Sequence, residues 1–295
     1  MTDPRICNYE DSTYRTDFWE GRGRDYEDQL ERRIIQKLLP ASGGKRLLEL
    51  GAGFGRLSQE YKAYETVVLL DYSFSQLQFA REQFGDAGYV YVAADAYRLP
   101  FQSGVFDAAT MIRVIHHFEN VPSVLNGIQR VMVEDADFIL EFANKRNVKA
   151  MLRHVLGKNG WNPYDREPVE FVELNYDFHP EYIAEELQKA GFETQKRIPV
   201  SWLRLAVLKQ YIPTSLLVNV DAVLQHSGLL ITPSVFTQNK VKKQPINQLD
   251  LPNDERLFLC PESQTALKRE GDVLISETGV RWAIRDGIYD FKAPL

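Results

Sequence analysis

The residues best suited to chemistry form a turn of three glycines behind an acid. Gly51, Gly53 and Gly55 alternate directly after an apolar run, and Glu49 lies two positions before the first of them. Glycine allows positive φ and, because it has no Cβ, lets a ligand lie against the backbone. A carboxylate at this place repels a pyrophosphate but suits a cationic ligand. The turn is therefore expected to bind a nucleotide or a similar molecule that carries positive charge.

A second acid stands where a ribose would need it. The apolar run 66–70 ends at Asp71, twenty residues after Gly51, and Tyr72 follows. An acid at the tip of the second strand is placed to accept both ribose hydroxyls, and Tyr72 could then cover one face of an adenine ring. The alternative for Asp71 is an N-cap of the helix that follows. In combination with the glycine turn, we favour the ribose role.

An acid followed by G-x-G-x-G resembles the first motif of the class I S-adenosylmethionine-dependent methyltransferases. The resemblance covers about residues 45–200 and implies S-adenosylmethionine as the cofactor. In that family the acid, here Glu49, lies near the amino end of the methionine moiety. The glycine turn that would contact the cofactor consists here of Gly51, Ala52 and Gly53.

The same resemblance continues after the third predicted strand. Residues 94–101 resemble the methyltransferase segment in which an Asp binds the adenine amino group and the next backbone amide meets a ring nitrogen; Asp95 and Ala96 hold these positions. A carboxylate can accept from an exocyclic amine, and an Asp that only caps a turn is the alternative. Because Leu-Pro-Phe follows as in the family, we favour the adenine role.

Two adjacent histidines follow the fourth predicted strand. Arg113, His116 and His117 lie on the loop that leaves its carboxyl end, and such loops face the cofactor or the substrate in open α/β sheets. An imidazole can take a proton near neutral pH, so one histidine is a candidate general base. The family's recurrent histidine matches His117 rather than His116. A histidine that only packs at the strand end, or methyl transfer without a base, are the alternatives.

Residues 1–44 are expected to form a lid or an N-terminal helix. A helical period begins at Arg24 and stops at Pro40. In class I methyltransferases a segment at this position often folds over the cofactor, so Trp19, Arg24 and Tyr26 are candidates to touch the methionine end. The alternative is a helix that only packs on the sheet.

Strands and helices alternate regularly from residue 45 onward, which predicts an α/β fold. We expect a doubly wound, mostly parallel, seven-stranded sheet of the Rossmann-like methyltransferase type over residues 45–241, with helical insertions. The predicted strands are 47–50, 66–70, 89–93, 105–111, 137–142, one from 191, and 229–236, and the first two helices are 56–64 and 73–84. Inserted segments at 145–178 and 201–228 are interpreted as a wall of the substrate pocket and part of a cap.

The end of the chain predicts a linker and a small β-rich module. Residues 242–253 are polar and contain two prolines, and residues 254–295 resemble a zinc-ribbon family that includes the activator subunit of several RNA and protein methyltransferases. Structural zinc needs about four N or S ligands. The module is expected to hold no metal, because only one of the four ligand positions is a cysteine: Cys260, Ser263, Ile275 and Thr278.

Composition limits the function classes. The chain has 295 residues, a net charge of −6 and two cysteines, which form neither a disulfide framework nor a metal cluster. It shows no concentrated basic face, no membrane span and no signal peptide, so we expect a cytoplasmic protein without nucleic-acid or membrane partners. The leading hypothesis is methyl transfer to an O, N or C nucleophile of a small-molecule acceptor. An RNA or protein methyltransferase and a non-catalytic S-adenosylmethionine-binding protein are the alternatives.

Overall fold

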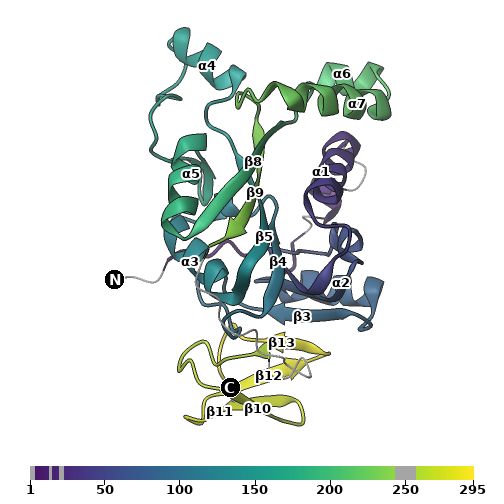
Figure 1. The fold of residues 1–295 in the computed structure, drawn as a ribbon, viewed down its shortest axis with the longest axis vertical. Coiled ribbons are helices and arrows are strands. Elements are labelled where there is room, and N and C mark those ends of the chain that lie inside the picture. Colours follow the sequence, from purple (N-terminus) through teal and green to yellow (C-terminus); the bar gives the residue numbers. More distant parts are fainter. Residues whose placement is uncertain (1–3, 13–14, 20–22, 243–256) are drawn as a thin grey trace.

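The computed structural model describes residues 4–12, 15–19, 23–242 and 257–295. Its main sheet has eleven strands, and seven adjacent ones form the central part in the order β3-β2-β1-β4-β5-β9-β8 (Figure 1). Strands β1 to β5 run parallel, and β9 is antiparallel to both of its neighbours. The prediction of a doubly wound, mostly parallel, seven-stranded sheet is confirmed. The strands are β1 Gly44–Leu50, β2 Tyr64–Asp71, β3 Tyr89–Ala93, β4 Phe106–Met111, β5 Met132–Ala143, β8 Phe192–Val200 and β9 Ser234–Val241.

Helices cover both faces of this sheet, as a parallel sheet requires. Successive strand residues point to opposite faces, so in β1 Leu47 joins one apolar core and Leu48 the other. One core takes side chains from α3 (Val121–Val131) and α5 (Pro180–Lys189). The other takes side chains from α1 (Asp25–Leu38) and α2 (Phe74–Phe84). The two cores hold the sheet in place, and the loops that carry the predicted site residues leave the carboxyl ends of its parallel strands.

Two elements differ from the sequence-based expectation. Residues 56–64 do not form an α-helix; after the glycine turn the chain makes only the short 3-10 helix η2 (Ser58–Tyr61) before it enters β2. The predicted strand 229–236 begins at Ser234. Its first part is apolar but irregular, because the Asn144 side-chain amide binds the carbonyls of Leu230 (3.2 Å) and Thr232 (2.8 Å).

Two helical insertions project from the carboxyl ends of β5 and β8 (Figure 1). The first contains α4 (Val148–Val155), and the second contains α6 (Ala206–Tyr211) and α7 (Thr214–Leu224). Between α4 and α5 lies a hairpin of β6 (Val169–Val172) and β7 (Asn175–Asp177). Within the described part of the chain, no helix is both long and apolar enough to cross a bilayer.

The C-terminal segment extends the main sheet at its β3 edge. Strands β10 (Leu267–Glu270), β11 (Val273–Ser276), β12 (Arg281–Arg285) and β13 (Ile288–Asp290) form an antiparallel meander, and β13 pairs with β3 in parallel. Buried Trp282 donates a hydrogen bond to Cys260 Sγ at 3.4 Å. The predicted linker 242–253 lies outside the described residues, except for Lys242. The domain boundaries and the absence of zinc stay predictions.

Candidate active site

The glycine turn closes against the end of β2. Gly51 and Gly53 both have positive φ (67° and 52°). A Cβ on Gly51 would lie 2.3 Å from the Val114 side chain, whereas a Cβ on Gly53 would meet no atom within 4 Å. Gly53 donates its N–H to Asp71 Oδ2 (2.7 Å), and Ser73 donates to Oδ1 (2.8 Å). A carboxylate has about four acceptor sites, so Asp71 can accept further hydrogen bonds from a ligand above Gly53.

A hollow with about 760 Å³ of empty space lies over this turn, beyond the carboxyl ends of β1 to β4. Most residues predicted to bind the cofactor or substrate share its wall. Those on it are Gly51, Gly53, Asp71, Tyr72, Asp95, Ala96, Arg113 and His117. Buried Asp95 accepts hydrogen bonds from the Tyr97 N–H (2.9 Å) and from Arg98 Nε (3.4 Å). The structure therefore brings residues from four strand ends to one cavity.

Glu49 and Ala52 line a second hollow beside the same glycine turn. Glu49 accepts hydrogen bonds from Ser58 Oγ (3.0 Å) and Tyr61 Oη (3.4 Å). Burial raises the pKa of Glu49 to about 7, against the effect of the two hydroxyl donors and of Arg56. Its carboxyl group therefore titrates near neutral pH, and a bound cation would shift it toward the ionised form. The sequence-based argument assumed a fully ionised Glu49, whereas the structure predicts full ionisation only when a cationic ligand is bound.

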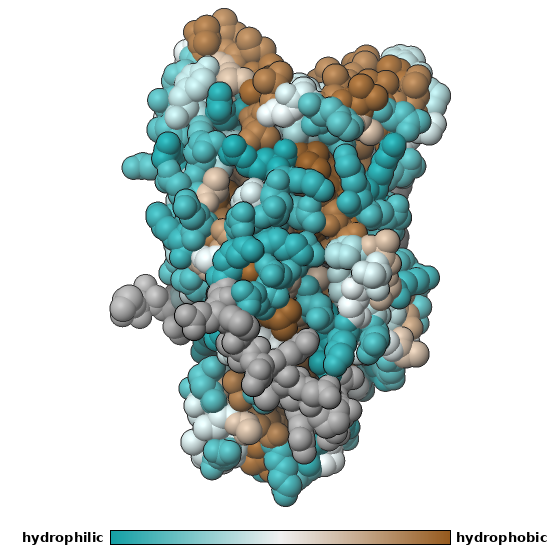
Figure 2. Space-filling view, viewed as in Figure 1, coloured by the Kyte–Doolittle hydropathy of each residue, from teal (hydrophilic) through white to brown (hydrophobic). Residues whose placement is uncertain are grey.

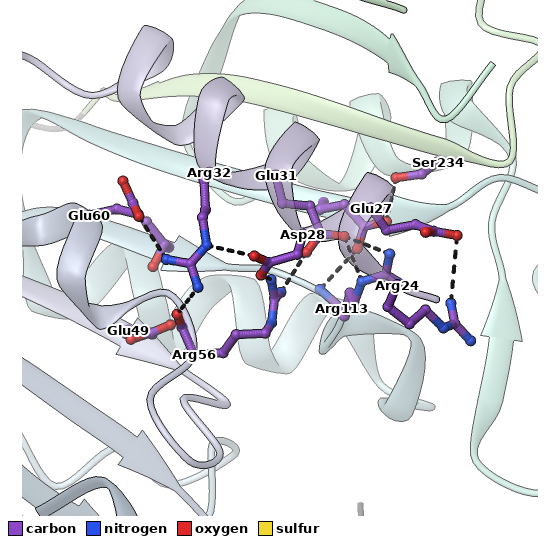
Figure 3. A network of polar contacts seen from close by, with 12 residues as sticks. Arg24, Glu27, Asp28, Glu31, Arg32, Glu49, Arg56, Glu60, Arg113 and Ser234 are labelled. Carbon is purple, nitrogen blue, oxygen red and sulfur yellow. Dashed lines mark hydrogen bonds and ion pairs between the residues drawn. The ribbon is translucent and has the colours of Figure 1, made fainter. Parts of the chain in front are cut away.

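Two arginines of a buried ion-pair network, Arg56 and Arg113, line this second hollow (Figure 3). Glu31 of α1 binds Arg113 at 2.6 Å and Arg56 at 2.5 Å. The Arg56 guanidinium also lies 3.7 Å from the centre of the Trp19 ring. Arg113 has φ 61°, and its N–H donates to Glu141 at 2.9 Å. Both arginines are thus held where they could meet an anionic group of a ligand.

Arg24 and Tyr26 were predicted near the methionine end, but they are not among the residues that line these two hollows. Arg24 Nη1 lies 4.0 Å from Glu27 (Figure 3). Buried Tyr26 donates its hydroxyl proton to Asp221 at 2.5 Å and so joins α1 to α7. The alternative of a helix that packs on the sheet describes Tyr26 correctly, and the cofactor-binding role of Arg24 stays a prediction.

His117 lies on the wall of the first hollow with a defined ring orientation. Its Nδ1 is 2.9 Å from the Leu174 carbonyl oxygen, which can only accept, so Nδ1 carries the proton. Nε2 is then an acceptor, and the Tyr9 hydroxyl lies 3.3 Å from it. Burial lowers the pKa of His117 below its usual value, partly offset by the Leu174 carbonyl. The neutral imidazole is therefore the form present at pH 7.

His116 does not line either hollow, although its ring centre is only 4.1 Å from that of His117. Burial lowers the pKa of His116 strongly, and the neighbouring His117 and Arg113 lower it further. Of the two candidates, the structure exposes only His117 to the first hollow.

Residues 4–12 form a strap across the first hollow, with Ile6, Cys7 and Tyr9 on its wall. At one end Arg5 binds Glu119 (2.9 Å). At the other end Glu10 accepts from the N–H groups of Phe74 and Ser75 and pairs with Lys292 of the C-terminal segment. Burial alone would raise the pKa of Glu10, but the two N–H donors and the Lys292 ammonium hold it at about 2.

Sequence reasoning missed the partners of the predicted residues. Tyr9 and Glu10 lie in a polar segment without periodicity, so nothing marked them. Glu31 carried a weak signal, because it and Glu27 each follow a core residue of α1, which places them beside the apolar stripe. Glu141 interrupts the apolar run of β5 and is buried, as Glu49 is in β1.

Comparison with known proteins agrees with this geometry. The family model described as "Methyltransferase domain" matches residues 48–140, which span the glycine turn, Asp71, Asp95 and His117. The ubiquinone/menaquinone biosynthesis C-methyltransferase UbiE of Vibrio parahaemolyticus is 29% identical over 174 residues, which cover 53% of this chain and 67% of that protein.

Solved structures show the same fold at low sequence identity. An S-adenosylmethionine-dependent methyltransferase of Thermotoga maritima aligns with TM-score 0.54 and 18% identity, over 79% of this chain and 97% of that one. A complex between the Haloferax volcanii Trm112 methyltransferase activator and a protein assigned as a methyltransferase aligns with TM-score 0.55 and 14% identity, over 76% and 95% of the two chains.

The donor set fits S-adenosylmethionine. Asp71 keeps acceptor sites for hydroxyl groups, and Gly53 leaves room for a ligand against the backbone. The carboxyl group of Glu49 titrates near neutral pH, so a cationic group beside it would favour its ionised form. The strand order, the cavity and the matched domain lead to one conclusion: the protein is an S-adenosylmethionine-dependent methyltransferase with a Rossmann-like methyltransferase fold.

Proposed function

We propose that this methyltransferase acts on a small-molecule acceptor held beside His117. The observation that carries the proposal is the orientation of His117, whose Nε2 is an acceptor at the wall of the cofactor cavity. The strap over that cavity and the net charge of −6 suit an enclosed small molecule better than a nucleic-acid backbone.

We also propose how the chain holds the cofactor. Asp71 accepts the ribose hydroxyls, Asp95 and the Ala96 amide bind the adenine edge, and Tyr72 covers the ring. At the methionine end, Glu49 lies toward the amino group. Arg56 and Arg113 supply positive charge in the same hollow, and we expect one of them to move from Glu31 toward the carboxylate of the methionine moiety.

The residues then have a limited chemical task. S-adenosylmethionine supplies a methyl group already activated on a sulfonium, so the protein must orient the nucleophile and exclude water. His117 Nε2 takes the proton that the acceptor loses when its O–H, N–H or acidic C–H group is methylated. The Tyr9 hydroxyl, now 3.3 Å from Nε2, marks the position that this acceptor proton would occupy.

One relative favours methylation of carbon over methylation of oxygen or nitrogen. UbiE of Vibrio parahaemolyticus is named a C-methyltransferase of ubiquinone and menaquinone biosynthesis. At 29% identity this favours carbon methylation as the first reaction to test, and it does not identify the acceptor.

An RNA or protein substrate is the second candidate function. It is supported by the resemblance of residues 254–295 to activator subunits. It is also supported by the fold similarity to the Haloferax volcanii complex that contains the Trm112 methyltransferase activator. Binding of bulk tRNA at physiological salt separates the two candidates, because tight, salt-sensitive binding would favour the RNA substrate.

The test of the proposed function is formation of S-adenosylhomocysteine with a panel of acceptors. We expect turnover with a small phenolic, enolic or amine acceptor and none with tRNA or a protein mixture. Turnover with tRNA alone would contradict the proposal. Cofactor binding without turnover on any class would instead indicate the non-catalytic alternative.

A further inference from the structure

Two projecting segments carry most of the exposed apolar side chains of this protein. We call residues 146–160, which contain α4, the first horn, and residues 201–233, which contain α6 and α7, the second horn. Of the sixteen large apolar residues that are exposed in the described part of the chain, four lie on the first horn and seven on the second. They are Val148, Leu152, Val155, Leu156, Leu205, Val207, Tyr211, Leu216, Val220, Val223 and Leu229.

The two horns rise from the same end of the molecule. β5 leads into the first horn and β8 into the second, and both strands end at the carboxyl edge of the sheet (Figure 1). Figure 2 shows apolar surface on both tips. A groove between them is lined from both sides, by Leu152 and Leu156 of the first horn and by Trp202 and Leu205 of the second.

The charge of the horns is opposite to that of the whole chain. The first horn contains Arg146, Lys149, Arg153 and Lys158 and no acid. The second contains two basic residues, Arg204 and Lys209, which share Glu27 of α1 as an ion-pair partner. Its single acid, Asp221, is buried and bonded to Tyr26. Neither horn therefore exposes a carboxylate, although the chain carries a net charge of −6.

We propose that the horns dock this methyltransferase on the surface of an anionic lipid bilayer. Contiguous exposed apolar surface marks an interaction site. Helices with apolar residues on one side and Lys or Arg beside them insert shallowly at the level of the lipid headgroups. A second copy of this chain would bring the same positive charge to the contact, whereas anionic headgroups neutralise it.

Docking of this kind needs no spanning helix, and it revises the expectation of no membrane partner. Because the horns extend from the carboxyl edge of the sheet, docking turns the edge that carries the cofactor cavity toward the bilayer. Lys149 and Arg153 lie exposed on the same helix as Leu152, so apolar and basic groups reach the surface together.

Vesicle sedimentation with the full-length chain tests the proposal independently of methyl transfer. We expect binding to phosphatidylcholine vesicles that contain roughly 30% phosphatidylglycerol, and about ten-fold weaker binding to pure phosphatidylcholine. The double variant Leu152→Glu/Val223→Glu should weaken binding to the mixed vesicles about ten-fold or more, because it places a charge on each tip. Lys149→Glu/Arg153→Glu should remove the preference for anionic lipid.

Leu295→Glu is the matched control, since Leu295 is 70% exposed but lies at the opposite end of the molecule (Figure 1). It should bind vesicles as the parent chain does, and all variants should keep the parent melting temperature. The proposal is overturned if the parent chain fails to bind mixed vesicles at low salt, or if the horn variants bind as well as Leu295→Glu. Concentration-dependent dimers that Leu152→Glu dissolves would also overturn it, because the horns would then cover each other.

Discussion

The carboxylate of Asp71 accepts a hydrogen bond from the N–H of Gly53, with 2.7 Å between Oδ2 and the nitrogen. This contact ties the end of β2 to the glycine turn and directs the remaining acceptor sites of Asp71 toward the cavity. Burial raises the pKa of Asp71, while the N–H groups of Ser73 and Gly53 counteract it. The position is therefore prepared for a ligand that donates hydrogen bonds.

Asp71→Ala should weaken S-adenosylmethionine binding by roughly 1 to 3 kcal/mol, because the ribose hydroxyls lose their charged acceptor. Asp71→Asn keeps one acceptor and should lose less. Calorimetric titration measures both, and Asp86→Ala, which removes an exposed acid that pairs with Arg81, serves as the control. An unchanged affinity in Asp71→Ala would remove this residue from the site.

Glu49 should make the stability of the cofactor-free protein depend on pH. Its pKa is about 7 in the folded state and 4.5 ordinarily, so the folded state binds more protons between these values. Its stabilising contribution is complete below pH 4.5 and is lost as the pH rises through 7. The parent chain should lose this contribution from pH 5 to pH 8, whereas Glu49→Gln should not. The free energy of unfolding of Glu49→Gln minus that of the parent chain should therefore rise by roughly 2 to 3 kcal/mol from pH 5 to pH 8.

Urea denaturation at the two pH values measures this difference. Glu65→Gln changes an exposed carboxylate of β2 and should leave the pH dependence as it is. If the free energies of unfolding of Glu49→Gln and the parent chain differ by the same amount at both pH values, the carboxyl of Glu49 does not titrate near neutral pH.

His117→Ala should reduce turnover by about two to four orders of magnitude, with nearly constant cofactor affinity, if His117 is the general base. The pKa of His117 is lowered, so kcat/KM of the parent chain should be flat near pH 7 and fall only at acidic pH, where Nε2 is protonated. That acidic limb should disappear in His117→Ala. His226→Ala, at an exposed histidine, is the control. If His117→Ala retained most of its turnover, His117 would not be a general base, and the protein would promote methyl transfer only by orienting the acceptor.

Deletion of residues 253–295 should lower solubility more than it alters cofactor affinity. The deletion uncovers the edge of β3 that pairs with β13 and exposes Phe101, which stacks on Phe258. Free strand edges promote aggregation. Lys292→Ala removes the pair with Glu10 and the contacts of the ammonium with the Tyr72 and Phe74 rings but keeps the strands, so it should leave solubility unchanged. A soluble, monomeric truncated chain that no longer binds cofactor would contradict this account.

Most of the sheet could be predicted because its strands are continuous apolar runs with turn residues at their ends. The predicted third strand has the bounds of β3, and the end of β2 at Asp71 follows from the acid that stops its apolar run. The motif residues then fell at strand ends, and the sheet order brought them together.

The remaining features depend on contacts distant in sequence. The helix expected at 56–64 is replaced by a turn because Arg56 reaches Glu31 of α1 and Tyr61 reaches Glu49. The position of the strap depends on Glu10 meeting the start of α2, which no local pattern marks. The pairing of β13 with β3 likewise joins segments about two hundred residues apart.

Calorimetric titration of the parent chain with S-adenosylmethionine, S-adenosylhomocysteine and NAD tests the cofactor assignment directly. We expect saturable binding at one site for the first two ligands and none for NAD, because Asp71 suits the ribose and Glu49 disfavours a pyrophosphate. Binding of NAD, or the absence of S-adenosylmethionine binding in the folded protein, would contradict this assignment.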